Sequence, residues 1–157
     1  MKNTKTVLVS VAAVALALIG VALYLQHQLD WAPCPLCIIQ RYVFLLVALV
    51  CIVFALLPTG TARAGATLAG LCALGGAGVA GWHVWVKAHP TVSCGIDPLE
   101  TALNRIPPAD WFPALFKADG LCATPYPPIL GLDTPQWSLV WFLIFALVLL
   151  WTSMRRR

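Results

Sequence analysis

The chain has 157 residues, of which 61% are hydrophobic and only 10% charged, and its mean hydropathy is +0.86. This composition excludes an ordinary soluble domain, in which about 25% of the residues are charged. Part of the formal net charge of +4 comes from the basic tail of residues 155–157. A cation cluster beside a membrane span explains that tail without a nucleic-acid partner.

The first apolar run, residues 6–28, follows Lys2 and Lys5 and contains no formal charge. It is longer than the 7–15 apolar residues typical of a signal peptide, and bulky residues stand where small ones would mark a cleavage site. We therefore expect a retained transmembrane helix.

The following segment, residues 29–37, carries Cys34 and Cys37 in C-x-x-C spacing. This spacing is typical of a dithiol/disulfide switch or of half a metal site. Pro35 suits the first position of a helix, where its missing N–H costs nothing. Cys34 then caps the helix and Cys37 lies in the first turn, where the positive end of the helix dipole stabilises a thiolate.

The second predicted transmembrane helix covers residues 38–57, with Arg41 near its outer end. Arg41 follows Cys37 by four residues and so lies on the same helix face. There its guanidinium can stabilise a Cys37 thiolate or polarise an acceptor beside it. The alternative is an arginine that flanks the membrane and snorkels towards the headgroups.

The third predicted span, residues 64–86, carries small residues at four-residue spacing, which let neighbouring helix backbones approach closely. These residues are Ala69, Ala73, Ala77 and Gly81.

His83 lies near the outer end of the third span, between Trp82 and Trp85. An ionisable residue at membrane depth is a functional candidate by default. The alternative is an interfacial histidine within a belt of aromatic side chains.

A long, proline-rich loop, residues 87–134, contains Cys94 and Cys122, and a fourth span follows at residues 135–153. Within the loop, apolar residues at helical spacing predict a short amphipathic helix that lies on the membrane surface or packs against the bundle. Its apolar residues are Trp111, Phe112, Leu115 and Phe116.

The distribution of charge predicts the topology of the chain. By the positive-inside rule, the side with cations and no acids is cytoplasmic, and this side holds Lys2, Lys5, Arg63 and residues 155–157. The sequence thus predicts an all-α membrane protein, a single domain over residues 1–157. Four transmembrane helices form a bundle with both termini in the cytoplasm, and loops 29–37 and 87–134 lie outside.

The topology places four cysteines on the outer side, while Cys51 and Cys72 lie inside apolar runs, where free cysteine behaves as a small hydrophobe. Three interpretations of the outer four compete: a tetrathiolate zinc site, two structural disulfides, and a redox relay. The loop cysteines do not form a second C-x-x-C of the usual zinc type. A haem attachment site would need histidine where Ile38 stands. Spacing and topology favour the relay.

The sequence resembles the bacterial disulfide bond formation protein B (DsbB) family of four-helix inner-membrane oxidoreductases. The resemblance extends over essentially the whole chain. The matching segments are Gln26-His27, residues 33–37 with Gln40-Arg41, Cys94, Trp111-x-Pro113, Phe116 with Gly120 and Cys122-Ala123, Leu130-Gly131-Leu132, and Pro135-Gln136-Trp137.

The resemblance implies a path for electrons. A reduced DsbA-type oxidase of the periplasm would attack a Cys94–Cys122 disulfide, and Cys122 would then exchange with a Cys34–Cys37 disulfide. A membrane quinone, ubiquinone or menaquinone, would accept the electrons from Cys37 beside Arg41. The resemblance also implies, on a weaker match, that His83 contacts the quinone. No metal is implied.

Overall fold

The structure is a computed structural model that describes residues 2–89, 96–122, 124 and 126–155. Four long helices dominate it: α1 (Lys2–Gln28), α2 (Pro35–Leu56), α3 (Ala62–Ala88) and α7 (Thr134–Met154). A 3-10 turn, η1 (Thr59–Thr61), joins α2 to α3. Three short helices follow α3: α4 (Ile96–Asn104), α5 (Pro107–Trp111) and α6 (Pro113–Phe116).

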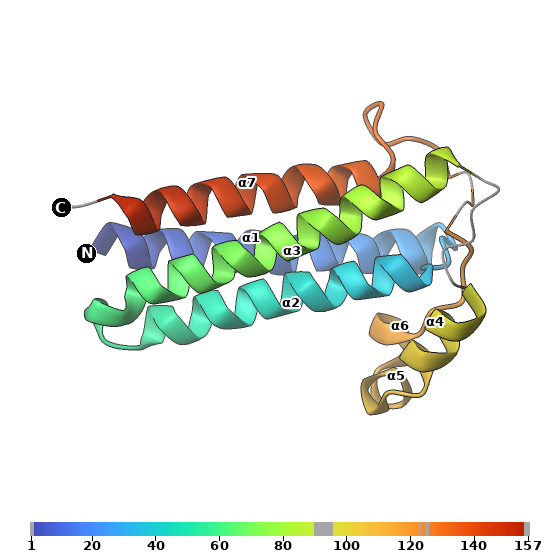
Figure 1. Ribbon diagram of the computed structural model, residues 1–157. Coiled ribbons are helices and arrows are strands. Elements are labelled where there is room, and N and C mark those ends of the chain that lie inside the picture. The colour runs from blue at the N-terminus through green and yellow to red at the C-terminus, as the bar shows by residue number, and fades with distance from the viewer. Residues whose placement is uncertain (1, 90–95, 123, 125, 156–157) are drawn as a thin grey trace.

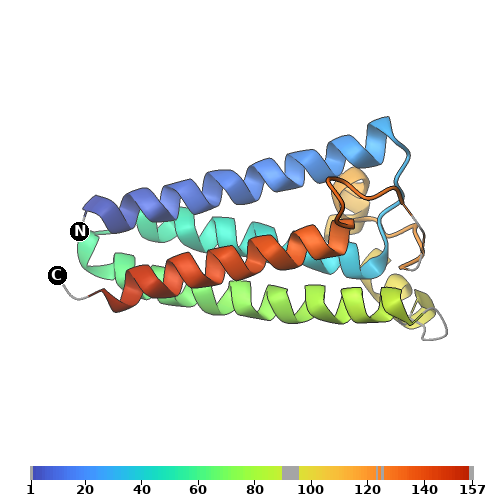
Figure 2. The ribbon, with the colours of Figure 1, turned by 90° about the horizontal axis from the view of Figure 1, so that it is seen from above.

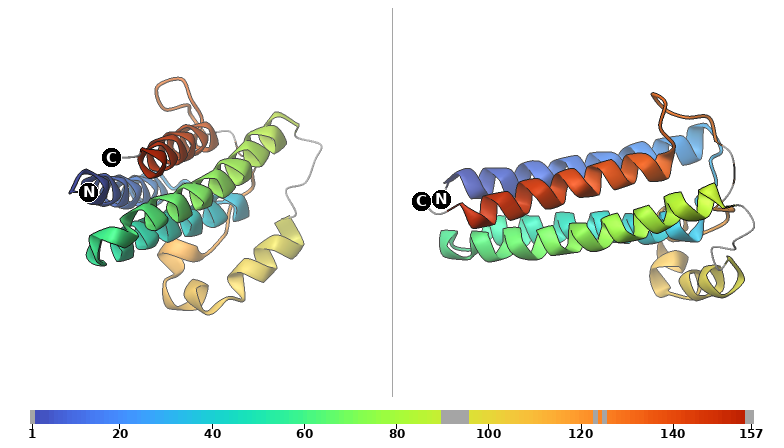
Figure 3. Two further views of the ribbon diagram at one scale, coloured as in Figure 1. Left: turned by 60° about the vertical axis from the view of Figure 1, so that its left-hand side comes forward. Right: turned by 45° about the horizontal axis from the view of Figure 1, so that its top comes forward.

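The long helices run side by side, and both ends of the chain lie at the same end of the bundle (Figure 1). Helices α4, α5 and α6 lie at the other end, to one side of the bundle, as the further views also show (Figure 3). α3 packs along both α2 and α7, and α1 packs along α2 but touches α3 and α7 only sparsely. Figure 2 shows the bundle from above.

All four long helices are long and apolar enough to cross a membrane, and the chain is a multi-pass membrane protein in its composition and fold. The predicted spans agree with them, with boundaries that differ by a few residues. The largest difference is at α1, which begins at Lys2 rather than at residue 6. α2 begins at Pro35, the helix start that the sequence predicts, three residues before the predicted span. Many large apolar side chains point outward, such as Leu49, Leu71 and Leu147 at 58%, 55% and 68% exposure. In a bilayer these side chains contact lipid.

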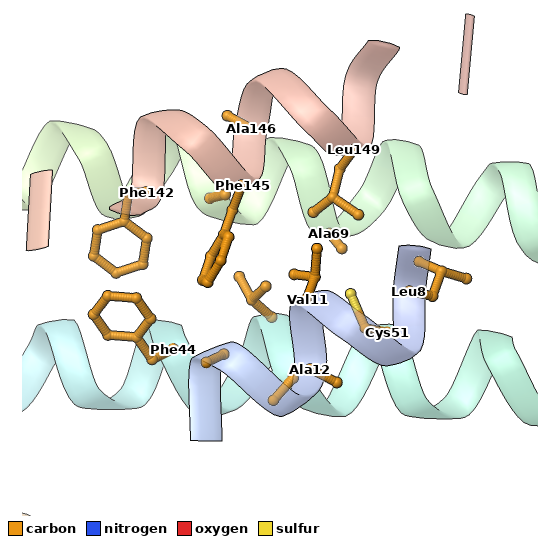
Figure 4. Close-up of a cluster of buried hydrophobic side chains, with 14 of the residues drawn as sticks. Leu8, Val11, Ala12, Phe44, Cys51, Ala69, Phe142, Phe145, Ala146 and Leu149 are labelled. Atoms are coloured by element: carbon orange, nitrogen blue, oxygen red, sulfur yellow. The ribbon is translucent and has the colours of Figure 1, made fainter. Parts of the chain in front are cut away.

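Aromatic rings and small residues fill the centre of the bundle (Figure 4). Phe44 of α2 stacks on Phe142 of α7 with ring centroids 4.0 Å apart, and its edge meets Phe145. α3 can pack against this stack only because its side chains at that level are small. Ala69, Ala73 and Ala77 are buried, as the four-residue spacing predicts.

The predicted stripe is wrong at Gly81, where a Cβ would meet nothing within 4 Å. The close approaches are instead at Gly65, Gly70 and Gly76, where a Cβ would overlap Phe54, Leu150 and Phe142 respectively. α3 faces two neighbouring helices, so its small residues form two rows rather than one.

Replacing Gly76 by alanine is expected to destabilise the bundle by about 1–3 kcal/mol, the usual cost of overpacking. A Cβ there would lie 2.6 to 2.8 Å from ring atoms of Phe142, and that ring is held by its stack on Phe44. The measurement is unfolding of the purified protein in detergent. Gly75→Ala is the matched control, because a Cβ at Gly75 meets nothing within 4 Å. Equal stability of the two variants would contradict the packing described here.

The long loop differs from the sequence prediction in one respect. The apolar residues from Trp111 to Phe116 do not form one helix, because α5 ends at Trp111 and α6 begins at Pro113. Phe112 between them has φ −134° and ψ 66°, which is not helical. Proline disfavours the helical conformation of the residue before it, which explains the break.

The break separates the apolar residues into an outward and an inward group. Trp111 and Phe112 are 73% and 62% exposed. Phe116 is buried and stacks on Tyr42 of α2 with ring centroids 4.5 Å apart. The loop is therefore docked on α2, and its outward aromatics are available to the membrane surface.

Asn104 at the end of α4 fastens the segment that leads to Cys122. Its side-chain amide donates to the Ala118 carbonyl and accepts from the Ala118 N–H, both at 2.9 Å. Ala118 also packs with Leu103 and with Ile38 of α2. These contacts hold the loop over the outer end of α2.

Candidate functional site

The site is built on the first turn of α2. Cys34 is the N-cap, Pro35 is the first helical residue, and the Cys37 N–H donates to Cys34 Sγ at 3.3 Å. Cys34 Sγ in turn donates to Cys37 Sγ, 3.1 Å away. Both cysteines are free thiols here. The helix start thus holds the two sulfurs at a distance from which a small movement closes a disulfide, as the C-x-x-C spacing and Pro35 predict.

The two thiols differ in their surroundings. Cys34 is buried, at 2% exposure, whereas Cys37 is half-buried. The hydrogen bond to Cys37, together with burial, raises the pKa of the Cys34 thiol well above its usual range. The Cys34 thiol therefore stays protonated, and negative charge on the pair resides at Cys37, beside the N-terminus of the helix.

His83 of α3 packs against the first turn of α2. Its Nε2 lies 3.5 Å from Cys34 Sγ, and its Nδ1 lies 3.1 Å from Nε2 of Gln40 on α2. The His83 and Gln40 side chains are only 2% and 4% exposed. This burial excludes the interpretation of His83 as an interfacial histidine of an aromatic belt. His83 therefore lies beside the Cys34 thiol.

Arg41 points into the bundle and not towards the headgroups. Its Nη1 donates to Gln26 Oε1 of α1 at 2.8 Å and to the Leu115 carbonyl at 3.0 Å. The residue is 6% exposed, so the snorkelling alternative is wrong. In the part of the chain that the structure describes, no carboxylate pairs with it. Arg41 is thus a buried cation held by neutral acceptors, and its charge is available to an anion nearby.

Cys122 lies against the same turn. It is 5% exposed, is disulfide-bonded, and packs with Cys34, Leu36 and Val86. Because its sulfur is already bonded, the interpretation of four cysteine thiolates on one metal does not fit this state. Cys94 lies outside the described residues, so the pairing of Cys94 with Cys122 stays a prediction.

Backbone contacts fix the position of Cys122 relative to Cys34. The N–H groups of Asp119 and Gly120 both donate to the Pro33 carbonyl, at 3.1 and 3.0 Å. A Cβ on Gly120 would lie 2.8 Å from the Ala32 carbonyl carbon and closer still to its oxygen. Only glycine allows the two loops to approach this closely.

Tyr126 adds a second tie between the same loops. Its hydroxyl donates to the Ala32 carbonyl at 3.2 Å, and its ring stacks on Trp31 with centroids 4.8 Å apart. Burial raises the pKa of the Tyr126 hydroxyl, so this donor keeps its proton at neutral pH.

A cavity of about 280 Å³ opens beside the cysteines. Its walls come from α1, α2, the last turns of α3, the start of α7 and the connecting loops, and it has lining residues on both α1 and α7, which touch only sparsely. Its lining includes the polar or reactive side chains of Cys34, Cys37, Gln40, Arg41 and His83, and most of the lining is apolar. A mostly apolar cavity with a few convergent polar groups is the usual form of a small-molecule site.

Cys51 and Cys72 take no part in this arrangement. Cys51 is fully buried in the core of the bundle and Cys72 packs at its edge, and both are free. They behave as small apolar residues, as predicted.

The comparisons with known proteins agree with this geometry. A family model described as "Disulfide bond formation protein DsbB" matches residues 4–152. The chain belongs to the DsbB family. A relative from Herminiimonas arsenicoxydans, named "Disulfide bond formation protein B", is 60% identical over 157 residues, covering 100% of this chain and 99% of the relative.

Two further relatives in the DsbB family extend the match to other bacteria. A protein of the same name from Ralstonia nicotianae is 43% identical over 154 residues, covering 98% of this chain and 96% of the relative. "Disulfide bond formation protein B 1" of Pseudomonas syringae pv. syringae is 47% identical over 149 residues, covering 94% and 88%. The resemblance of the sequence to this family is confirmed.

Sequence reasoning missed two site residues, Gln26 and Gln40. Both were part of the resemblance, yet neither was assigned a role. A signal was present in Gln40, since an uncharged amide in an apolar helix, three residues after Cys37, needs a buried partner. The identity of that partner, His83, depends on how α2 and α3 pack and could not be read from the sequence.

Proposed function

We propose that the protein reoxidises a DsbA-type thiol oxidase of the bacterial periplasm and passes the electrons to a membrane quinone. The observation that carries this proposal is the meeting of Cys34, Cys37, Cys122 and Arg41 beside one apolar cavity. Family membership supports disulfide formation as the overall activity. The whole chain, residues 1–157, would act as one membrane domain.

The charges support an orientation with the site on the periplasmic side of the inner membrane. Lys5 and Arg63 lie at the end that carries the termini, bonded to the carbonyls of Leu57 and Arg155. The acidic residues Asp119 and Asp133 lie at the other end, with the cysteine site. Cations gather on the cytoplasmic side of membrane proteins, and the periplasm permits disulfides to persist.

Within this proposal each exchange step balances. A partner thiolate attacks Cys94, and the bond between Cys94 and Cys122 breaks to release Cys122 as a thiolate. Cys122 then attacks Cys34 Sγ, which breaks the Cys34–Cys37 disulfide and releases Cys37 as a thiolate. The second thiolate of the partner then attacks the mixed disulfide, so the partner leaves with its own disulfide and Cys94 is released as a thiolate. Cys94 attacks Cys122 in the Cys34–Cys122 disulfide, which re-forms the Cys94–Cys122 bond and leaves both Cys34 and Cys37 reduced.

The arrangement of the chain supports these roles. Cys122 packs on Cys34, the sulfur that it would attack, whereas Cys37 is the half-buried member of the pair and lines the cavity. The helix N-terminus and Arg41, four residues on, favour a thiolate at Cys37. Cys34 and Cys37 lose two electrons and two protons when their disulfide re-forms.

The cavity fits a quinone of either kind, ubiquinone or menaquinone. Its apolar walls on α1 and α7 suit an isoprenoid chain, and Arg41, Gln40 and His83 supply polar groups for a ring carbonyl. When bound, a quinone supplies an acceptor for two electrons and two protons. On this proposal Arg41 holds the ring beside Cys37.

The test is turnover by the purified protein in lipid nanodiscs with a reduced DsbA-type oxidase and a short-chain quinone. We expect oxidation of the partner only when quinone is present, with one quinol formed per partner disulfide. Folded, correctly inserted protein that oxidises no partner, or does so equally well without quinone, would refute the proposal.

Arg41→Lys is expected to weaken quinone binding by about 10- to 100-fold, seen as a higher KM. Lysine keeps the charge but lacks the planar guanidinium, whose Nη1 donates to both Gln26 and the Leu115 carbonyl. A hydrogen bond to a charged group contributes about 1.5–3 kcal/mol. The matched control is Arg63→Lys, at the opposite end of the bundle. An unchanged KM in Arg41→Lys would show that Arg41 does not hold the quinone.

A further inference from the structure

Three soft ligand atoms converge at the start of α2. Sγ of Cys34, Sγ of Cys37 and a ring nitrogen of His83 all lie within 4.8 Å of one another. Two thiolates and an imidazole are a ligand set that Zn²⁺ and related d¹⁰ cations prefer. The three residues come from two helices that pack along each other, so the cluster is held by the bundle itself.

The distances suit a tetrahedral ion after a small adjustment. Zn–S and Zn–N bonds of about 2.3 and 2.0–2.1 Å place two sulfurs about 3.8 Å apart and a sulfur and nitrogen about 3.5 Å apart. Here Cys34 Sγ lies 3.5 Å from His83 Nε2 and 3.1 Å from Cys37 Sγ. Cys34 Sγ and His83 Nε2 are already at the required separation. The two sulfurs need to move apart, which a side-chain rotation of Cys37, the half-buried member, would allow.

Gln40 orients the His83 ring. The other ring nitrogen, Nδ1, lies 3.1 Å from Nε2 of the Gln40 side-chain amide, which is itself buried. A metal ion on His83 Nε2 needs Nδ1 to carry the ring proton, so the Gln40 amide would turn over and its oxygen would accept from the Nδ1–H. The neighbouring cation Lys87 is paired with Asp133 at 2.9 Å. Two thiolates neutralise a divalent ion, so the complex buries no net charge.

We propose that the reduced Cys34–Cys37 pair and His83 bind one Zn²⁺ ion, with the fourth position facing the cavity. The site exists only in the reduced protein, because a Cys34–Cys37 disulfide removes both thiolates. Binding releases the thiol proton of Cys34, and that of Cys37 where it is still present, and changes no oxidation state. Bound zinc holds the pair in the dithiol form and blocks re-formation of the disulfide, a consequence for turnover that rests on the function proposed above.

Co²⁺ serves as the spectroscopic probe, with full-length Cys94→Ser/Cys122→Ser protein reduced under anaerobic conditions so that no loop thiol competes. We expect one Co²⁺ per chain, a thiolate-to-cobalt charge-transfer band and the intense d–d bands of a tetrahedral site. Zn²⁺ should displace the cobalt. The oxidised protein should show none of these signals. A charge-transfer band that persists in the oxidised protein or in a Cys37→Ser variant would overturn the proposal.

His83→Ala removes the third ligand, whereas Gln40→Leu removes only the side chain that orients this ligand. Both are expected to weaken metal binding, Gln40→Leu by about 10- to 100-fold, the usual effect of losing a group that holds a ligating histidine. Cys72→Ser should bind as the parent does. Unchanged affinity in His83→Ala would refute the three-ligand site.

A second measurement uses the native chain and does not depend on the double variant. Zn²⁺ should protect Cys34 and Cys37 of reduced wild-type protein from alkylation, and a chelator should restore their labelling. Labelling of both cysteines at an unchanged rate would count against the site. Metal binding without quinone turnover would refute only the proposed function, and turnover without metal binding would refute only the site.

Discussion

Replacing Cys37 by serine is expected to reduce quinone-dependent turnover by at least about a thousandfold, as the loss of a reacting nucleophile does in other enzymes. Cys37 is the half-buried sulfur at the cavity, and its Sγ accepts a hydrogen bond from Cys34 Sγ that a serine hydroxyl can also accept. Serine retains a small polar side chain but cannot form the disulfide or carry the electrons. The measurement is quinol formation with a reduced DsbA-type partner.

The controls for Cys37→Ser are Cys51→Ala and Cys72→Ser. Both residues are free cysteines in the membrane-spanning part of the bundle, away from the cavity. Quinone-dependent turnover by these two variants should match that of the parent protein. If Cys37→Ser kept a substantial fraction of the parental rate, the electrons would have to leave by another route.

Gly120→Ala is expected to slow electron transfer from the loop cysteines to Cys34 by roughly 30-fold. A Cβ would lie 2.8 Å from the Ala32 carbonyl carbon, and backbone atoms cannot give way as a flexible side chain does. The loop must then move off Pro33, with loss of the bonds from Asp119 and Gly120. Two hydrogen bonds at about 1 kcal/mol each correspond to that factor.

The effect of Gly120→Ala should be confined to one step. Reduction of quinone by a chemically reduced Cys34–Cys37 pair should keep its parental rate, while oxidation of the partner slows. Gly60→Ala serves as the control, because a Cβ at Gly60 meets nothing within 4 Å. A variant that oxidises the partner at the parental rate would show that the docking of this loop on residues 32–33 does not matter for exchange.

Features set by short-range chemistry could be predicted from the sequence. The four apolar runs, the helix start at Pro35 and the relation of Cys34 to Cys37 each depend on residues within one turn or one run. The structure agrees with all three. Arg41 was correctly placed on the face of Cys37, but whether it snorkels or turns inward depends on Gln26 and Leu115, which lie far away in the sequence.

Features set by packing between helices could not be predicted. The contacts of His83 with Cys34 and Gln40 join residues 49 and 43 positions apart. The small residues of α3 could be found in the sequence, but not which neighbouring helix each one contacts. α3 packs against two helices at once, and a Cβ at Gly81 would meet neither of them within 4 Å. The break at Phe112 was within reach of the sequence, since Pro113 follows it, but the helical spacing of the apolar residues obscured it.

The most direct test of the relay follows the thiols of the native protein in quinone-free nanodiscs. The protein is mixed anaerobically with excess reduced DsbA-type partner, and samples are alkylated before and after quinone is added. We predict that Cys34 and Cys37 are both labelled before the addition and lose their labelling after it, with one quinol formed per disulfide. Cys34 and Cys37 that remain labelled after quinone is added, or that are never labelled while the partner is oxidised, would contradict this account.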